Sequence, residues 1–136
     1  MKHKMYCIFA KESVLKMNGN RGKMSTQAGH AYLHAYWDAM DADNDLPFEV
    51  RHNVSQKKKM ASEYKNSERA YKITLIVDTV DELNALQEKY KNVCGTSLVT
   101  DAAFTVFDEP TTTCLGLGPI SEDNIGDDIK SLKVFI

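Results

Sequence analysis

Hydrophobic residues along the chain fall into compact runs separated by longer stretches in which they recur every three or four positions. The first compact run, MYCIFA at 5–10, predicts a buried strand. A loop with two glycines at 16–22 then leads into a helix whose first residues include Arg21 and Lys23. Small side chains recur along this helix, so we expect it to lie close against a sheet. These small residues are Ala28, Ala31, Ala35 and Ala39.

The second half of the chain has a strand–helix–strand order. Runs rich in β-branched residues predict strands at 70–78 and 95–102. Between them, Thr79 and Glu82 have the spacing of a capping box and predict the start of a helix. Such a unit has parallel strands joined by a right-handed crossover. A further strand and a closing helix are predicted at 111–119 and 121–132.

The order of these elements predicts a single α/β domain over residues 1–136. We expect a three-layer sandwich in which a small mixed sheet of about four strands carries helices on both faces. The least regular part is a polar excursion at about 42–70, which the pattern describes only as helical or loop-like.

Composition and charge narrow the class of protein. A net charge of −2 excludes a wholesale polyanion binder but allows a local basic patch. No apolar run approaches the roughly 18 residues of a membrane span, and the apolar run near the N-terminus is too short for a signal peptide. The three cysteines have no metal-binding or disulfide pattern, so we expect free buried thiols in a reducing compartment. These features predict a cytoplasmic protein.

Two polar segments would meet at one edge of the predicted sheet. In open α/β sheets, ligands bind at the carboxyl ends of parallel strands. The first strand ends before the loop that carries Arg21, Gly22 and Lys23, and a later strand ends at Asp101, shortly before Thr105. If the two strands are neighbours, the ammonium, carboxylate and hydroxyl groups converge and could activate a water beside a carbonyl group. From spacing alone, a surface ion pair with a turn-capping threonine is the stronger interpretation.

The sequence lacks the motifs of several other kinds of site. The chain has no G-x-S-x-G, P-loop or dinucleotide motif. His30 and His34 are one helical turn apart but lack the glutamate of H-E-x-x-H, so we predict no metal site. The start of the helix remains suited to an anion. The basic run Lys57, Lys58 and Lys59 is either a solvated face or a set of phosphate contacts.

Two motifs resemble those of the type-2 (archaeal and eukaryotic-type) peptidyl-tRNA hydrolases. The first is KMNGNRGKMSTQAGHA at 16–31, which resembles that family's K-M-G-x-G-K-[IVL]-A-A-Q-x-x-H-A with a loop two residues longer. The second is GTSLVTDAAFTVFDEPTTTCLGLGP at 95–119, which follows the family pattern without a gap from Asp101 to Pro119. The resemblance covers nearly the whole chain except the excursion at 42–70.

The resemblance implies an enzyme of translation that hydrolyses the ester between a peptide and the 3′ ribose of tRNA, without a metal or cofactor. It assigns catalytic roles to Lys23, Asp101 and Thr105, and substrate binding to Gln27 and His30. Arg21, Gly22 and, more weakly, Lys57, Lys58 and Lys59 would contact the substrate or tRNA phosphates. The implied partner is tRNA, and a flat face bearing aromatic residues could support a homodimer.

The second motif departs from the family at three positions and in one turn, where the family's P-G-[ST] is replaced by Glu109-Pro110-Thr111. A glycine is replaced by Ala103, a basic residue by Phe104 and a glutamine by Val106. Alanine fits only if the backbone there does not need a positive φ, whereas Phe104 could stack on a base. These departures keep two alternatives open: a non-catalytic tRNA-binding protein of this fold, and a related fold that acts on another ester or amide.

Overall fold

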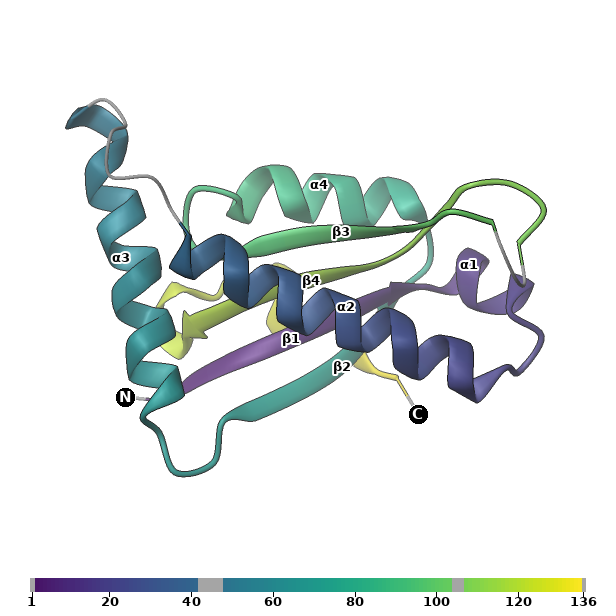
Figure 1. Ribbon diagram of the computed structural model, residues 1–136, viewed down its shortest axis with the longest axis horizontal. Coiled ribbons are helices and arrows are strands. Elements are labelled where there is room, and N and C mark those ends of the chain that lie inside the picture. The colour runs from purple at the N-terminus through teal and green to yellow at the C-terminus, as the bar shows by residue number, and fades with distance from the viewer. Residues whose placement is uncertain (1, 42–47, 104–106, 136) are drawn as a thin grey trace.

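Within the described part of the chain, five strands form one mixed sheet. The computed structural model describes residues 2–41, 48–103 and 107–135, with side chains in the second range described from residue 56 onward. The strands are β1 (His3–Ala10), β2 (Tyr71–Val77), β3 (Thr96–Asp101), β4 (Thr111–Ser121) and β5 (Lys133–Val134). Their order in the sheet is β3-β4-β1-β2-β5 (Figure 1). β1 and β2 pair in parallel, whereas the β1–β4, β3–β4 and β2–β5 pairs are antiparallel.

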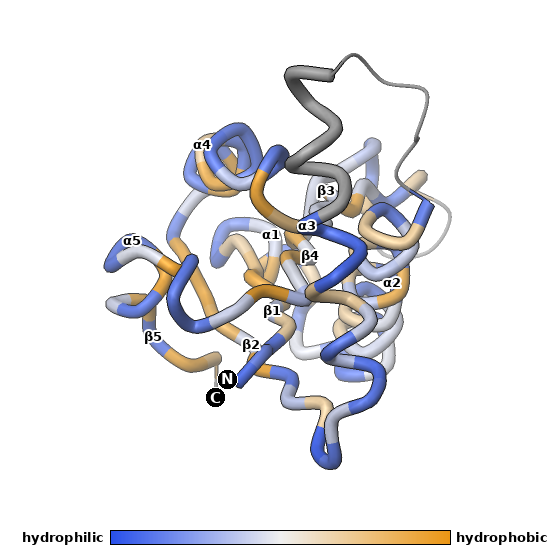
Figure 2. The backbone as a smooth tube through the Cα atoms, turned by 90° about the vertical axis from the view of Figure 1, so that its left-hand side faces the viewer, coloured by the Kyte–Doolittle hydropathy of each residue, from blue (hydrophilic) through white to orange (hydrophobic). Residues whose placement is uncertain are grey.

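Helices cover both faces of the sheet, as the sequence predicts. The helices are α1 (Lys11–Lys16), α2 (Arg21–Met40), α3 (Phe48–Lys65), α4 (Val80–Tyr90) and α5 (Asp127–Lys130), with a 3₁₀ helix η1 at Glu122–Asn124. Seen along the sheet, α2 lies on one side and α4 on the other (Figure 2). This arrangement confirms the α/β sandwich.

Alternate side chains of β1 enter two hydrophobic cores, one on each face of the sheet. Tyr6 and Ile8 belong to one buried cluster with Leu83 of α4, whereas Cys7 and Phe9 belong to a second cluster on the α2 side. Successive side chains of a strand point to opposite faces, so a strand covered on both sides reads as one continuous apolar run. The buried first strand predicted from MYCIFA is therefore confirmed.

The small-residue face of α2 lies directly on the sheet. Ala31 and Ala35 are fully buried. A Cβ atom at Gly116 of β4 would overlap the Ala31 carbonyl, and one at Gly95 would overlap the Ala35 carbonyl. This close approach lets α2 run across β4 and β3, which brings the start of the helix to the end of β3.

The predicted capping box begins α4. The Thr79 hydroxyl accepts a hydrogen bond from the backbone N–H of Glu82 at 3.3 Å. The inward face of this helix is buried through Leu83, Leu86 and Tyr90. The backbone N–H of Val80, in the first turn of α4, donates a hydrogen bond to the carboxylate of Glu12 on α1, at 2.8 Å.

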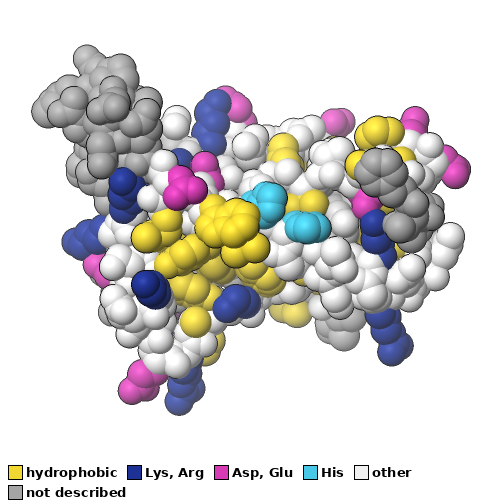
Figure 3. Space-filling view, viewed as in Figure 1, with side chains coloured by type: hydrophobic (Ala, Val, Ile, Leu, Met, Phe, Trp, Pro, Cys, Tyr) yellow, Lys and Arg dark blue, Asp and Glu magenta, His cyan; other side chains and the backbone are white. Residues whose placement is uncertain are grey.

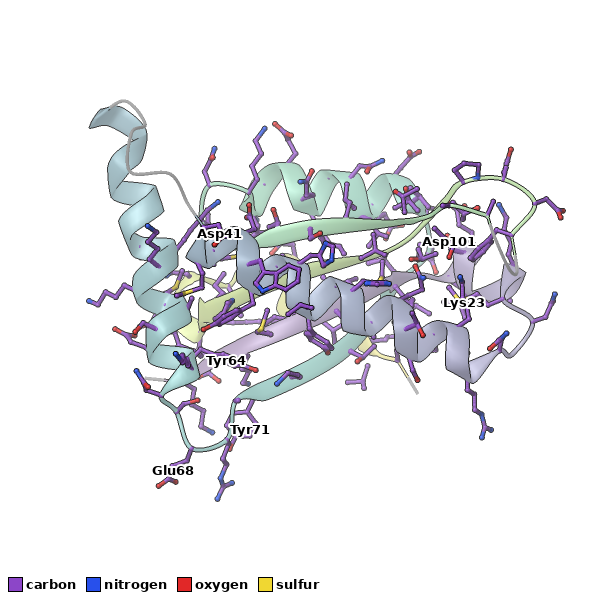
Figure 4. All side chains as sticks on the ribbon, in the orientation of Figure 1. Lys23, Asp41, Tyr64, Glu68, Tyr71 and Asp101 are labelled. Carbon is purple, nitrogen blue, oxygen red and sulfur yellow. The ribbon has the colours of Figure 1, made fainter. Side chains whose placement is uncertain are left out.

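The excursion predicted at 42–70 contains α3, whose described side chains cap one end of the sheet. Met60 packs into the cluster on the α4 side, whereas Tyr64 packs with Met5 and Ala35 on the α2 side. The Tyr64 hydroxyl donates to the Ala70 carbonyl at 2.7 Å. This helix therefore closes the core at the end away from Lys23 (Figure 4).

The strands at 70–78 and 95–102 run in the same direction, as predicted, with β4 and β1 between them. The structure differs from the prediction in three other elements. The predicted closing helix is divided into η1 and α5, because Gly126 begins a new helix after the first short turn. The two-residue β5 raises the strand count to five, and α1 is too short for periodicity to detect.

The three cysteines, Cys7, Cys94 and Cys114, are free and buried, as predicted. Across residues 2–41, 48–103 and 107–135, no helix is both long enough and apolar enough to cross a membrane.

Candidate active site

The start of α2 carries positive charge. Asn20 caps the helix, because its side-chain oxygen accepts a hydrogen bond from the Lys23 N–H at 2.9 Å. The first turn contains no acidic residue, although an acid there would be stabilised by the helix dipole. Arg21 and Gly22 lie exposed in this turn. The turn thus combines the positive end of a helix with two cationic side chains, which favours an anionic ligand.

Lys23 and Asp101 form an ion pair between Nζ and Oδ2 (Figure 4). Their side chains are 14% and 7% exposed, so the pair is largely shielded from water. The prediction brought them together by assuming that β1 and β3 are neighbours, whereas β4 lies between these strands. The two residues meet because α2 crosses β4 and reaches β3 (Figure 1).

Both carboxylate oxygens of Asp101 accept hydrogen bonds. Oδ1 accepts from the Ala103 N–H at 2.8 Å, and Oδ2 accepts from the Gln27 side-chain amide at 3.3 Å in addition to Lys23. The hydrogen bond from Lys23 lowers the pKa of Asp101, burial opposes this shift, and the Ala103 N–H adds to it. Asp101 is therefore an ionised carboxylate at neutral pH.

Gln27 is held inside the protein. Only 3% of this residue is exposed, and its side-chain oxygen accepts a hydrogen bond from the Thr113 hydroxyl at 2.7 Å. Thr113 itself is fully buried on β4. A buried chain of hydrogen bonds thus runs from Thr113 through Gln27 to Asp101. This arrangement orients the carboxylate and differs from the direct substrate contact that the resemblance implies for Gln27.

His30 lies on the exposed surface of α2, two turns after Lys23. Positive charge at His30 helps to lower the pKa of Asp101, which places the imidazole within electrostatic reach of the ion pair. The ring packs edge-on against that of His34, with 5.7 Å between centroids. His30 is therefore available to a molecule bound beside Asp101.

The segment after β3 contains a strained residue. Ala103 has a φ of +69°, in the left-handed region that favours glycine. The departure from glycine at this position therefore introduces backbone strain beside Asp101. The predicted site residues Phe104 and Thr105 lie outside the described residues, as does Val106.

The lysine run lies on α3, at the opposite end of the molecule from Lys23 (Figures 1 and 4). Lys57 is 3.7 Å from the carboxylate of Asp38, and Lys59 is 3.9 Å from that of Glu63. Lys58 belongs to the same helix. The structure thus does not bring these lysines to the site that contains Asp101.

Sequence reasoning missed Thr113 and the capping role of Asn20. Three consecutive threonines occupy 111–113, and only the register of β4 decides which of them faces Gln27. Asn20 stands directly before a helix and has the residue type of an N-cap, so this signal was present. Among the described side chains, no group of three or more His, Cys, Asp or Glu is arranged to hold a metal ion.

Comparisons with known proteins give the family. The family model described as "Peptidyl-tRNA hydrolase PTH2" matches residues 4–135. The peptidyl-tRNA hydrolase of Sulfurisphaera tokodaii is 29% identical over 116 residues, which cover 82% of this chain and 87% of that protein. The family match confirms the resemblance that the two motifs carry.

Proposed function

The chain belongs to the peptidyl-tRNA hydrolase PTH2 family of ester hydrolases, and on that premise we propose that Lys23 and Asp101 carry out the chemical step. The observation that carries the proposal is their shielded ion pair beside a cationic helix start. Ester hydrolysis needs a group that accepts a proton from water and a group that stabilises the oxyanion. A carboxylate and an ammonium at one point supply both.

Asp101 is the proton acceptor. In the free protein its carboxylate is occupied by Lys23, Gln27 and the Ala103 N–H, and its lowered pKa makes it a weak base. Substrate binding raises its basicity when the Lys23 ammonium turns from Oδ2 toward the ester carbonyl. The freed oxygen then accepts a hydrogen bond from water, while Gln27 and Ala103 keep the carboxylate in place.

Each atom has a destination in this reaction. The water oxygen attacks the carbonyl carbon of the ester and passes a proton to Asp101, while Lys23 stabilises the negative oxygen of the tetrahedral intermediate. The bond to the ribose 3′ oxygen then breaks. The proton held by Asp101 passes to that oxygen, which leaves as a hydroxyl group. The peptide leaves as a carboxylate once its acid proton is released to water.

The start of α2 positions the terminal phosphate. Arg21 and Gly22 are exposed there, so the guanidinium and the backbone at the positive end of the helix can bind a phosphate oxygen. Such contacts position the substrate without reading its sequence. The run Lys57, Lys58 and Lys59, at the far end, would contact tRNA phosphates remote from the ester. The roles of Thr105 and Phe104 stay predictions.

Hydrolysis of an N-acetylated aminoacyl-tRNA tests this function. We expect the purified protein to release the blocked amino acid, and its tRNA binding to weaken as salt is raised. Binding without release would favour the non-catalytic alternative. Release from small esters without salt-dependent tRNA binding would favour a different substrate.

The site of action and the oligomeric state also stay predictions. We expect the protein to act in the cytoplasm, where peptidyl-tRNA is formed. A flat face bearing aromatic residues would supply the contact of a homodimer. Sedimentation equilibrium measures that state.

A further inference from the structure

Three exposed aromatic side chains continue the candidate site along α2. His30 and Trp37 follow Lys23 at intervals of seven residues. Lys23, His30 and Trp37 therefore lie on nearly the same face of the helix. His34 lies between the two aromatic residues. In Figure 3 the histidines lie over α2, between a hydrophobic patch and the end that carries Lys23 and Asp101 in Figure 4.

The side chains of His30, His34 and Trp37, called the aromatic row, contact one another ring to ring along α2. The His30 and His34 centroids are 5.7 Å apart with the rings nearly perpendicular, and those of His34 and Trp37 are 5.3 Å apart with 32° between the planes. Trp37 is 48% exposed, although burial of an indole is strongly favourable. A large aromatic side chain left half in water, about four turns along α2 from Lys23, offers a surface for another flat ring.

The charge along this face favours an anionic partner. From Arg21 to Trp37 the helix contains no Asp or Glu, in a chain whose net charge is −2. The first acid after Trp37 is Asp38, whose carboxylate accepts the Thr96 N–H at 3.1 Å and lies 3.7 Å from the Lys57 ammonium. The row from His30 to Trp37 therefore contains no acidic residue, and the exposed Asp41 follows Trp37 by one turn, after the end of α2.

We propose that His30, His34 and Trp37 form a stacking surface for the unpaired nucleotides at the 3′ end of tRNA. The inference rests on the proposed function, because that function places the terminal ribose at Lys23 and Asp101. The bases preceding the terminal ribose then lie along the exposed face of α2. Aromatic side chains stack on any base, so this surface contributes affinity without sequence readout.

The neighbouring face of α2 has a different character. An open apolar depression there is lined by Tyr32, Leu33, Tyr36 and Tyr64, among others. Leu33 is 45% exposed, close to the value for Trp37, but it lies outside the aromatic row. Leu33→Ala is therefore a matched control for Trp37→Ala: both remove a half-exposed side chain from the same helix.

Trp37 is the only tryptophan in the chain, so its fluorescence reports directly on stacking. The probes are two RNA hairpins with the same stem, one with an unpaired 3′ overhang ending in CCA and one blunt, titrated at a fixed salt concentration. We expect only the overhang hairpin to quench Trp37. The variants at Trp37 have no tryptophan, so their binding is followed by the anisotropy of a dye on the hairpin. Trp37→Ala should weaken binding of the overhang hairpin about 5- to 100-fold, whereas Trp37→Phe and Leu33→Ala should bind like the wild type.

Three results would overturn the inference. They are equal binding of the overhang hairpin by Trp37→Ala and the wild type, equal quenching by the blunt hairpin, and self-association that Trp37→Ala abolishes while RNA binding is unchanged. Release of N-acetyl amino acid by the wild type, measured in parallel, separates this failure from failure of the proposed function. Intact release with any of these three results removes only the stacking surface.

Discussion

The Lys23 ammonium and the Asp101 carboxylate form a shielded ion pair where the first turn of α2 meets the end of β3. Asp101 is held from three directions, by Lys23, by the Gln27 amide and by the Ala103 N–H. The ionised state of this carboxylate is therefore a property of the folded protein, and it has consequences for stability as well as catalysis.

Asp101 should contribute stability that depends on pH. Its folded pKa lies below the ordinary value of 3.8, so its contribution is present above that value and is lost as the pH falls through the folded pKa. The difference in free energy of unfolding between the wild type and Asp101→Asn should persist down to about pH 5. It should shrink below pH 3.8. Urea unfolding from pH 7 to pH 3 measures it, and a difference that grows toward low pH would contradict the assignment.

Thr113 should act as a positioning residue through Gln27. Thr113→Val keeps the shape of the side chain but leaves the Gln27 oxygen unpaired in a buried position, at a cost of about 1–3 kcal/mol. We expect kcat to fall about 10- to 100-fold, because the carboxylate loses its orientation, with KM little changed. Thr112→Val is the control, since that hydroxyl contacts Thr100 in an exposed position. Equal kcat values in the two variants would argue against the role of Gln27.

Ala103→Gly should stabilise the protein. Relief of a left-handed alanine is expected to raise the free energy of unfolding by about 1 kcal/mol, as measured by urea denaturation. Ala102, which does not have a positive φ, is the control. Glycine there should destabilise by up to about 1 kcal/mol, because it adds freedom to the unfolded chain. The same change in both variants would contradict the strain at Ala103.

The contact between α2 and β4 should tolerate no added carbon. Gly116→Ala places a methyl group against the Ala31 carbonyl and should lower the free energy of unfolding by about 1–3 kcal/mol. Gly29 lies on α2, and a Cβ atom there would meet open space. Gly29→Ala should therefore raise the free energy of unfolding by roughly 0.5–1 kcal/mol through helix propensity. Thermal unfolding compares the two variants, and similar melting temperatures would exclude the close approach.

The fold was largely predictable because its signals are local. The continuous apolar run of β1, the capping box at Thr79 and the alanine face of α2 each depend on a few neighbouring residues. The order of strands is not local: the sequence could state the neighbouring of β1 and β3 only as a condition, and β4 lies between them. The helix at Lys11–Lys16 was missed because six residues are too few to show a period.

The candidate site was predictable in its charged residues and not in the polar residues behind them. Lys23 and Asp101 stand at a helix start and a strand end, which sequence patterns can locate. The part of Gln27 depends on its burial, and that of Thr113 on the register of β4. The positive φ of Ala103 likewise cannot be derived from the alanine itself, although the glycine at this position of the family pattern indicated it.

Single-turnover release of peptide from a model peptidyl-tRNA tests the central claim most directly, with the wild type, Lys23→Ala, Asp101→Asn and the double variant compared. Each single substitution should slow release about 100- to 1000-fold, because it removes one of the two groups that stabilise the transition state. The double variant should be scarcely slower, since the two groups act together. Full activity in both single variants, or an inactive wild type, would contradict the assignment of catalysis to Lys23 and Asp101.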